Sequence, residues 1–479
     1  MNNSSIANPA LAEGRSERAA FFWWACTETG VIAYFFTAVV VLWSVYLGLD
    51  LPGGLGQRPP SSRSVSGDDP FLVATTRWDG QHYLEIASQG YSYEPDRASS
   101  VAFFPLYPML VAAVFRGTGM PLEWAGLLVA HVLLIAAFVL LAAYASQRYA
   151  RASGQLVAYA VLAFGVFPTT FFMRMSYSES TFLVLALLAM FGMERGWRPI
   201  VVVAIVGLAT ASRSVGVALV PVVWLYVWRR AEAGPHPQPL SRKRARGVLN
   251  WLSRKRERGG LDELSRSAIS EPSGPHPQPL SRKRERGVLN RLARIACLTP
   301  VALWGLLAYM AFQYAEFGEP LAFAKTQSHW RGRPDVPWGE KALALAAWEP
   351  IWSAYMPSSP GYAGRYAREL PAWCNLQMAN PVFFVAAAAL VGLGAAKRWL
   401  SGREILLAAG LLLIPYVTRG FDMCMASQGR FAGVVFPVYL VLGRLLCGAP
   451  PVVAVGVFAL SAVYLAVYAA LFAAGYVMI

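Results

Sequence analysis

The sequence predicts an all-α polytopic membrane protein, because it combines low charge with long apolar segments. Of its 479 residues, 56% are hydrophobic and 14% are charged, whereas a soluble domain carries roughly 25% charged residues. The apolar segments are continuous rather than alternating, which is typical of spanning helices and not of barrel strands. We therefore expect helices whose backbone hydrogen bonds are satisfied within the membrane.

Eleven apolar segments are expected to cross the membrane. They cover residues 30–49, 124–145, 155–173, 179–194, 199–212, 214–229, 295–315, 380–396, 403–418, 430–446 and 450–474. The first 25 residues are mixed polar and lack a signal-peptide core, so the first span is expected to be retained. Residues 103–118 are apolar but short, and we expect them to form a helix that lies in the membrane interface.

Basic residues mark every second connection between these spans and so predict the orientation. They follow the second, fourth, sixth and eighth spans, and positive charge favours the cytoplasmic side. The N-terminus is then cytoplasmic and the C-terminus faces outward. The segments expected on the outer face are 50–123, 174–178, 317–379 and 419–429.

The chain is expected to consist of two membrane modules, 1–229 and 295–479, around a basic cytoplasmic insert at 230–294. The insert holds 16 Lys and Arg and 6 Asp and Glu, so it accounts for most of the net charge of +15. Residues 234–250 recur at 274–290 with one change. Such a Pro- and Arg-rich repeat has little to bury, and we expect disorder. Binding of anionic lipid or nucleic acid is the alternative, but no nucleic-acid partner is expected.

Polar residues that could carry chemistry gather at the ends of spans on the expected outer face. The first outer loop carries Arg77, Trp78 and Asp79, with His82 one helical turn later. The other candidates are Glu179, Arg213, Lys325, Gln327, Gln428 and Arg430. A pore would hold charges at depth within its spans. This placement instead indicates a pocket open to water and to the lipid leaflet, which suits a lipid-phosphate substrate.

Metals and cofactors are not expected. Asp68 and Asp69 precede Pro70 and indicate a turn, with a metal pair as the alternative. The five cysteines lack metal-ligand spacing. Cys374 and Cys424 share the expected outer face, which would permit a disulfide. Four aromatic residues of the first loop are expected to be interfacial anchors, with stacking on a sugar as the alternative for one of them; these are Trp78, Phe103, Phe104 and Tyr107.

Several motifs occur in one order along the chain. The first runs from Arg77 to Tyr91, with Asp79-Gly80 and His82-Tyr83-Leu84 inside it, and continues at Phe103–Pro108. The later motifs are Tyr177–Ser180, Ser212–Gly216, Gly318–Phe323 with Gln327 and Trp330, and Gly429–Phe431. This series resembles the PIG-V family, the mannosyltransferases that add the second mannose to GPI anchors, together with their bacterial relatives.

The resemblance implies a GT-C-type glycosyltransferase, with its active site in a first outer loop that contains juxtamembrane helices. It implies transfer of a sugar, mannose in the family, from a polyprenyl-phosphate donor with inversion. Asp79 matches the acidic residue expected to act as base. The anionic phosphate leaves without a strong acid, so one base and a cationic clamp suffice. Arg213 and Arg430 are candidates for the clamp, and His82 would orient Asp79 or contact the sugar.

The acceptor is left open among a glycolipid, a glycan and a protein. The expected location is the inner membrane of a bacterium, with the site on the periplasmic or extracytoplasmic side. The alternative function is a transporter or flippase of a lipid-linked substrate, which would share the apolar spans and the pocket. Transporters typically contain inverted repeats and broken helices, and the sequence shows no such internal symmetry.

Overall fold

The computed structural model describes residues 9–51, 69–149, 154–232, 280–365 and 370–476. All regular elements in these ranges are helical, which confirms the predicted all-α class. By length and composition, four helices can cross a membrane, or up to six if each of two bent helix pairs is one span. The four are Ala19–Leu49, Leu122–Arg148, Leu376–Ala396 and Pro451–Ala473, and the bent pairs are Gly154–Val166 with Pro168–Arg174 and Gly287–Ala302 with Trp304–Phe317.

Each of the eleven predicted spans contains a helix, but several are short or interrupted. The short helices are α7 (Glu179–Glu194), α8 (Pro199–Ser212), α9 (Val220–Glu232), α17 (Gly402–Pro415) and α19 (Pro437–Cys447). Residues 103–118 supply another short helix, α4 (Leu106–Thr118). The count of eleven crossings therefore stays a prediction.

Prolines explain two of the interruptions. Helix α6 (Gly154–Val166) is followed by the 3₁₀ segment η2 (Pro168–Arg174), and the two are bent by 76°. Likewise α18 (Gln428–Gly433) is separated from α19, which begins at Pro437. Proline lacks the N–H that would continue the helix and clashes with the preceding turn. As a result, backbone segments that are not spanning helices border the candidate site.

Two further interruptions occur where no proline starts the new segment. Arg213 is extended, with φ −158° and ψ 149°, and separates α8 from the 3₁₀ segment η3 (Ser214–Leu219). Helix α17 ends in a π-helical turn, η7 (Tyr416–Gly420). Such π turns are often found at functional sites.

The first outer loop folds into α2 (Pro70–Thr75), α3 (Asp79–Gln89) and η1 (Ser100–Ala102) before α4. Helix α3 is held by its apolar face, where Tyr83 and Leu84 pack with Tyr107 of α4 and Ala125 of α5 (Leu122–Arg148). This packing fixes the beginning of α3, and with it Asp79, at one end of the bundle.

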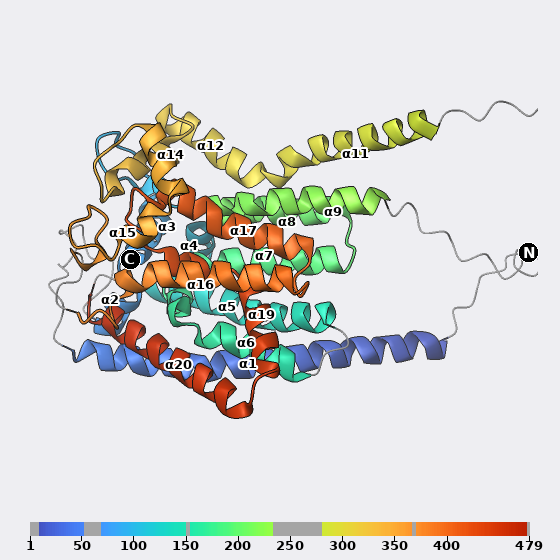
Figure 1. Ribbon diagram of the computed structural model, residues 1–479, viewed down its shortest axis with the longest axis horizontal. Helices are drawn as coiled ribbons and strands as arrows, with labels where there is room; N and C mark the ends of the chain where they lie inside the picture. Colours follow the sequence, from blue (N-terminus) through green and yellow to red (C-terminus); the bar gives the residue numbers. More distant parts are fainter. Residues whose placement is uncertain (1–8, 52–68, 150–153, 233–279, 366–369, 477–479) are drawn as a thin grey trace, which may run out of the picture. The chain divides into compact units, whose positions relative to one another are not determined.

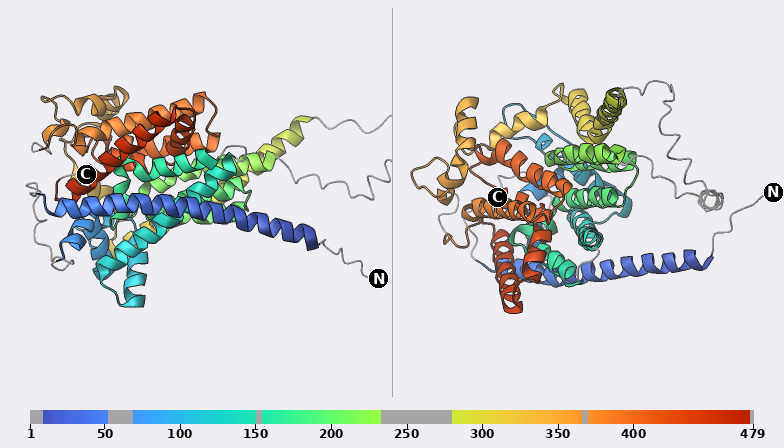
Figure 2. Two further views of the ribbon diagram at one scale, coloured as in Figure 1. Left: turned by 90° about the horizontal axis from the view of Figure 1, so that it is seen from below. Right: turned by 45° about the vertical axis from the view of Figure 1, so that its right-hand side comes forward.

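Segments from the two ends of the sequence form another part of the core. Helices α1 (Pro9–Leu49) and α20 (Pro451–Ala473) pack against each other, as Figures 1 and 2 show. A Cβ on Gly48 would lie 2.2 Å from the carbonyl oxygen of Ala470, so the two backbones approach closely. Val41, Val45, Leu465 and Phe472 are buried in this region together with Phe171 of η2.

The second outer loop follows α12 (Trp304–Phe317) and is largely helical. It contains α13 (Ala322–Lys325), η5 (Thr326–Trp330), α14 (Trp338–Ala346), α15 (Glu349–Ser353) and η6 (Ala363–Arg365), and it leads into α16 (Leu376–Ala396). Figure 1 shows α14 and α15 at the same end of the bundle as α3. The loop is therefore placed where it can contribute residues to the site.

The chain divides into two compact units. Residues 1–223 and 299–479 form the first unit, which contains all of the candidate site, and residues 224–298 form the second. Residues 233–279, which hold most of the expected basic insert, lie outside the described residues. Helix α11 (Leu280–Ala302) begins inside the expected insert, so the end of that range is helical rather than disordered.

Candidate active site

A cavity of about 340 Å³ lies where the first outer loop meets the ends of later helices. It is bordered by α3, η1, the α8–η3 junction, η5, η7 and α18. The predicted site residues that line it are Trp78, Asp79, His82, Arg213, Gln327 and Arg430. These residues come from positions up to 352 apart in the sequence, so folding brings the separate motifs together.

Asp79 is the first residue of α3 and its side chain is 26% exposed. Its Oδ2 accepts a hydrogen bond of 2.5 Å from Nη1 of Arg430. Burial alone would raise the pKa of this carboxyl, but the Arg430 guanidinium outweighs it, with further help from His82 and Arg213. The net effect lowers the pKa of Asp79 below its ordinary value. Asp79 is therefore an ionised carboxylate at the cavity wall.

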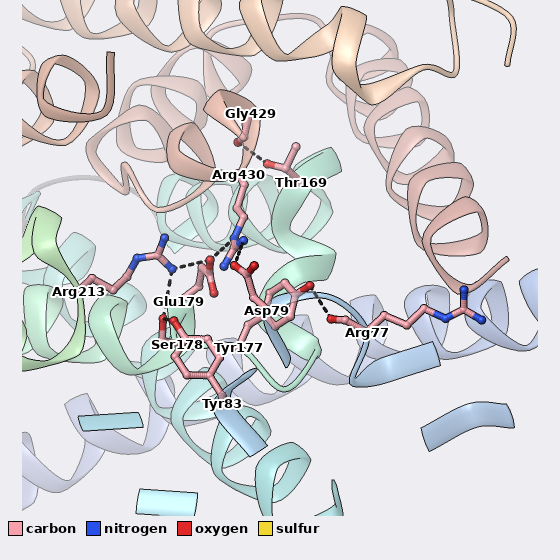
Figure 3. Close-up of polar contacts among 10 residues, drawn as sticks. All are labelled: Arg77, Asp79, Tyr83, Thr169, Tyr177, Ser178, Glu179, Arg213, Gly429 and Arg430. Carbon is pink, nitrogen blue, oxygen red and sulfur yellow. Dashed lines mark hydrogen bonds and ion pairs between the residues drawn. The ribbon is translucent and has the colours of Figure 1, made fainter. Parts of the chain in front are cut away.

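Arg430, Glu179 and Arg213 extend this ion pair into a chain of alternating charges, shown in Figure 3. Glu179 is 1% exposed and accepts from Nε of Arg430 and, over 2.5 Å, from Nη1 of Arg213. Arg213 also donates to the Ser178 hydroxyl at 3.3 Å. Both predicted clamp arginines thus already have carboxylate partners, and Glu179 lies behind the cavity wall.

Two tyrosines support this chain of charges. The Tyr177 ring lies 4.5 Å from the Arg430 guanidinium, and its hydroxyl donates to the carbonyl oxygen of Arg77. The Tyr83 hydroxyl is 2.7 Å from Ser178 Oγ. Burial, helped by Glu179 and Asp79 and opposed by Arg213, raises the pKa of Tyr83 to about 12. Tyr83 is therefore neutral at neutral pH and does not compete with Asp79 as a base.

Arg419 is a cavity residue that the sequence analysis missed. It lies in η7, lines the cavity, and has no carboxylate partner in the part of the chain that the structure describes. Burial and the charge of Arg213 lower its pKa to about 10, so it is still charged at neutral pH. Three guanidinium groups thus face two carboxylates, which leaves one positive charge for an anionic ligand.

The aromatic side of the cavity is built by the first and second outer loops. The His82 ring stacks on Phe103 at 4.7 Å, and Trp330 meets the edge of Phe103 at 6.3 Å. Trp78 has φ 57° and ψ −120°, and its buried Nε1 has no hydrogen-bond partner among the described residues. Strained residues are concentrated at functional sites. These rings fit a sugar, which combines apolar faces with hydroxyl groups.

Two of the predicted interfacial anchors are core residues instead. Tyr107 is fully buried and donates to the carbonyl oxygen of Gly126 at 3.0 Å. Phe104 is 4% exposed and packs against Tyr309 and Phe323. Tyr107 lies inside because it is on the face of α4 that packs on α3 and α5, and Phe104, which precedes α4, is covered by α12 and α13.

Besides Glu179, three predicted site residues lie outside the cavity lining. The Arg77 side chain points away from the chain of charges, as Figure 3 shows, and it lies near Gly475. Lys325 is exposed and forms an ion pair with Glu319. Gln428 is buried and donates from Nε2 to the carbonyl oxygen of Pro415. Each position is close to the site in sequence, but the local backbone directs the side chain elsewhere.

The sequence also suggested a turn or metal pair at Asp68 and Asp69 and a disulfide between two cysteines. Asp69 is the N-cap of α2 and accepts from the backbone N–H of Phe71 at 2.9 Å, which is a turn-like role. Asp68 lies outside the described residues. Cys374 and Cys424 are both free thiols, so the disulfide is not formed.

Comparison with known proteins finds relatives of the region that contributes Asp79, Glu179 and Arg213. Residues 60–231 match the family model described as Mannosyltransferase (PIG-V). The chain is 35% identical over 142 residues to GPI alpha-1,6-mannosyltransferase 2 of Rattus norvegicus and 35% identical over 166 residues to that of Homo sapiens. Residues 60–231 of this chain are thus similar to the PIG-V mannosyltransferases.

The PIG-V-like similarity covers only part of each protein. The match takes in 27% of both chains for the rat relative and 31% of both for the human one. The region matched by the family model includes Asp79, Glu179 and Arg213 but ends before Arg419 and Arg430. The family model therefore does not cover the cavity residues that follow position 231.

Two solved structures were also found, both of an oligosaccharyltransferase from Archaeoglobus fulgidus. One is tethered to an acceptor peptide and the other is in complex with an inhibitory peptide and a dolichol-phosphate. They are 13% and 14% identical to this chain, and both have a TM-score of 0.37. The matches cover 92% of this chain and 55% and 56% of the two oligosaccharyltransferase chains. A similarity this low carries no conclusion about fold or function.

Proposed function

We propose that this protein is a GT-C-type glycosyltransferase that moves a sugar, in line with its relatives a mannosyl unit, from a polyprenyl-phosphate donor to a hydroxyl group of an acceptor. The observation that carries the proposal is the pairing of an ionised Asp79 with an uncompensated Arg419 around one cavity. The first can accept a proton and the second can bind a phosphate. The names of the relatives supply the class of sugar.

The proposed reaction is a single displacement. The acceptor oxygen attacks the anomeric carbon, the bond from that carbon to the phosphate oxygen breaks, and Asp79 takes the proton of the attacking hydroxyl. The configuration at the carbon is inverted. Polyprenyl phosphate leaves as an anion, so the charge that develops there needs a cation more than a proton.

The roles of the arginines in this proposal follow from their partners. Arg430 holds Asp79 in place and keeps it ionised, while Glu179 holds Arg430 and Arg213. Arg419 is free to bind the donor phosphate, and Arg213 borders the same cavity and adds to the positive field. Arg419, rather than Arg430 and Arg213, is therefore proposed as the main residue that binds the donor phosphate.

The sugar is proposed to lie against the aromatic side of the cavity. His82, stacked on Phe103, would face the ring of the sugar together with Trp330. Gln327 would donate a hydrogen bond to a sugar hydroxyl. The location proposed for this site is the outer face of a bacterial inner membrane, and the acceptor is a glycolipid, a glycan or a protein.

Transport of a lipid-linked substrate is the second candidate function. The broken helices around the cavity favour it, because transporters often place interrupted helices at their binding sites. A transferase forms product in detergent, whereas a transporter needs a sealed membrane.

The test is to incubate detergent-solubilised protein with radiolabelled polyprenyl-phosphate mannose and membrane lipids that supply acceptors. We expect labelled product that is separable from the donor. Donor that stays intact in detergent but crosses the membrane of proteoliposomes would support the transporter instead.

A further inference from the structure

Four large apolar side chains are exposed on helices α14 and α15 of the second outer loop and on the residue between them. The exposed fractions are 66% for Trp338, 75% for Leu343, 55% for Trp348 and 49% for Trp352. Monomeric soluble proteins rarely expose a contiguous apolar surface of this kind, and such a surface marks an interaction site.

The charged residues of the same helices mostly point inward. Lys341 Nζ pairs with Asp422 at 2.5 Å and its side chain is 14% exposed. Glu349 accepts from Arg333 at 2.8 Å and is 18% exposed. Glu340 is the exception, since it is exposed. Polarity is thus inverted relative to a helix that faces water, where charged residues form the outer face.

This apolar face continues the outer side of a candidate membrane span. The Tyr355 hydroxyl, just after α15, donates to the carbonyl oxygen of Met378 at the beginning of α16. One turn further along α16, Val382 is 57% exposed, and Val385 follows at 46%. Trp373, two residues before the N-cap of α16, is 64% exposed. Exposed apolar side chains therefore lie both on the loop and on the span that this hydrogen bond joins.

We propose that the face formed by Trp338, Leu343, Trp348 and Trp352 lies in the headgroup–acyl boundary of the lipid leaflet. Trp and Tyr are enriched at this depth because their rings are apolar and carry one polar group. A helix with an apolar face lies flat there. The continuity with α16 selects the lipid leaflet over a partner protein, because both surfaces would contact the same apolar phase.

The leaflet contact has a consequence for the cavity. The Tyr416 hydroxyl donates to the carbonyl oxygen of Leu345, and the backbone N–H of Gly332 donates to that of Asp422. Together with the Lys341–Asp422 pair, these bonds tie the α14–α15 region to both sides of Arg419. If the proposed function holds, the docked helices set Arg419 at the depth of a lipid phosphate.

The test measures the depth of single nitroxide labels in full-length protein in phosphatidylcholine vesicles, with the exposed Cys297 replaced by Ser. Leu343→Cys is the probe. Val382→Cys serves as the lipid reference and Asp335→Cys, whose native side chain is 77% exposed, as the water reference. Collisions with oxygen and with a water-soluble nickel chelate report the environment of each label by electron paramagnetic resonance.

We expect the label at 343 to collide with oxygen as the one at 382 does and to be shielded from nickel. A label at 343 as open to nickel as the one at 335 would overturn the proposal in favour of a face exposed to water, and a label shielded from both oxygen and nickel would overturn it in favour of a face covered by protein. Trp348→Cys repeats the measurement if Leu343→Cys is not recovered. Because the readout needs no enzyme activity, its failure is distinct from failure of the proposed function.

Discussion

At the scale of residues, the proposed mechanism depends on which arginine forms an ion pair with which carboxylate. Asp79 could be predicted from the sequence because it sits in a compact polar motif, and the structure places it at the cavity. The partners of Arg213 and Arg430 could not be predicted, since Glu179 lies far from Arg430 in sequence and meets it only through the packing of α7 and α18. Arg419 carries no local signal, because a single arginine after an apolar segment is an ordinary headgroup contact.

Arg419→Ala is predicted to weaken donor use by roughly 10- to 100-fold, the scale of a charged hydrogen-bonding group worth about 1.5–3 kcal/mol. Arg419→Lys should recover part of the loss, because it restores the charge without the planar fork. The measurement is the donor KM and kcat in detergent. Arg97→Ala, at an exposed pair with Glu94, is the control. Unchanged donor kinetics in Arg419→Ala would exclude the role.

Arg430→Gln is predicted to change the pH dependence of transfer. Arg430 is the strongest influence that lowers the pKa of Asp79, and burial opposes it. Once Arg430 is removed, burial should raise that pKa, so the base becomes protonated at higher pH. We expect the acid limb of kcat/KM to move to higher pH than in the wild type. Arg331→Gln should leave the profile unaltered, and so would Arg430→Gln if Asp79 were not the base.

At the scale of helices, apolar segments predict where helices occur but not where they break. The break at Arg213 between α8 and η3 could be predicted from the sequence, because a single charged residue separates two apolar segments there. Pro168 and Pro437 are also readable as breaks. Pro415 likewise marks the end of α17, but it does not predict that the following turn, Tyr416–Gly420, is π-helical or that the Tyr416 hydroxyl bonds the distant carbonyl of Leu345.

Gly48→Ala is predicted to destabilise the packing of α1 on α20. The new Cβ would lie 2.2 Å from the Ala470 carbonyl oxygen, so the helices must separate. Overpacking of this kind typically costs about 1–3 kcal/mol. Thermal unfolding in detergent, followed by intrinsic fluorescence, should show a lower Tm. Gly456→Ala in α20 has open space around its Cβ and should not lower it. Equal Tm values for the two variants would contradict the close approach of the helices.

On the scale of the whole molecule, composition was sufficient for the all-α membrane class, and the motif series supplied cavity residues from α3, the α8–η3 junction, η5 and α18. It did not supply η7, and it did not show how these distant segments pack around one cavity. For Gln428 and Lys325, nearness in sequence to a motif did not give nearness to the cavity. Side-chain direction depends there on local backbone that no motif specifies.

The basic insert is predicted to be dispensable for transfer. Replacing residues 234–279 with a short Gly/Ser linker leaves α11 intact and removes basic residues that the proposed reaction does not use. We expect normal membrane insertion and transfer within about twofold of wild type. The check is activity per amount of folded protein. A well-expressed deletion variant without activity would assign the insert a function.

The central claim is that Asp79 is the general base, and Asp79→Asn tests it most directly. The amide keeps the shape of the side chain but cannot take the proton, and general-base catalysis is worth on the order of 10²–10⁴-fold. Glu85→Gln, on the same helix but outside the cavity, is the matched control. The measurement is turnover of radiolabelled donor in detergent, with donor binding measured on the same preparations. The account predicts that Asp79→Asn folds, binds donor and loses at least about 99% of turnover, whereas Glu85→Gln keeps most of it. Turnover in Asp79→Asn above roughly a tenth of wild type would contradict the claim.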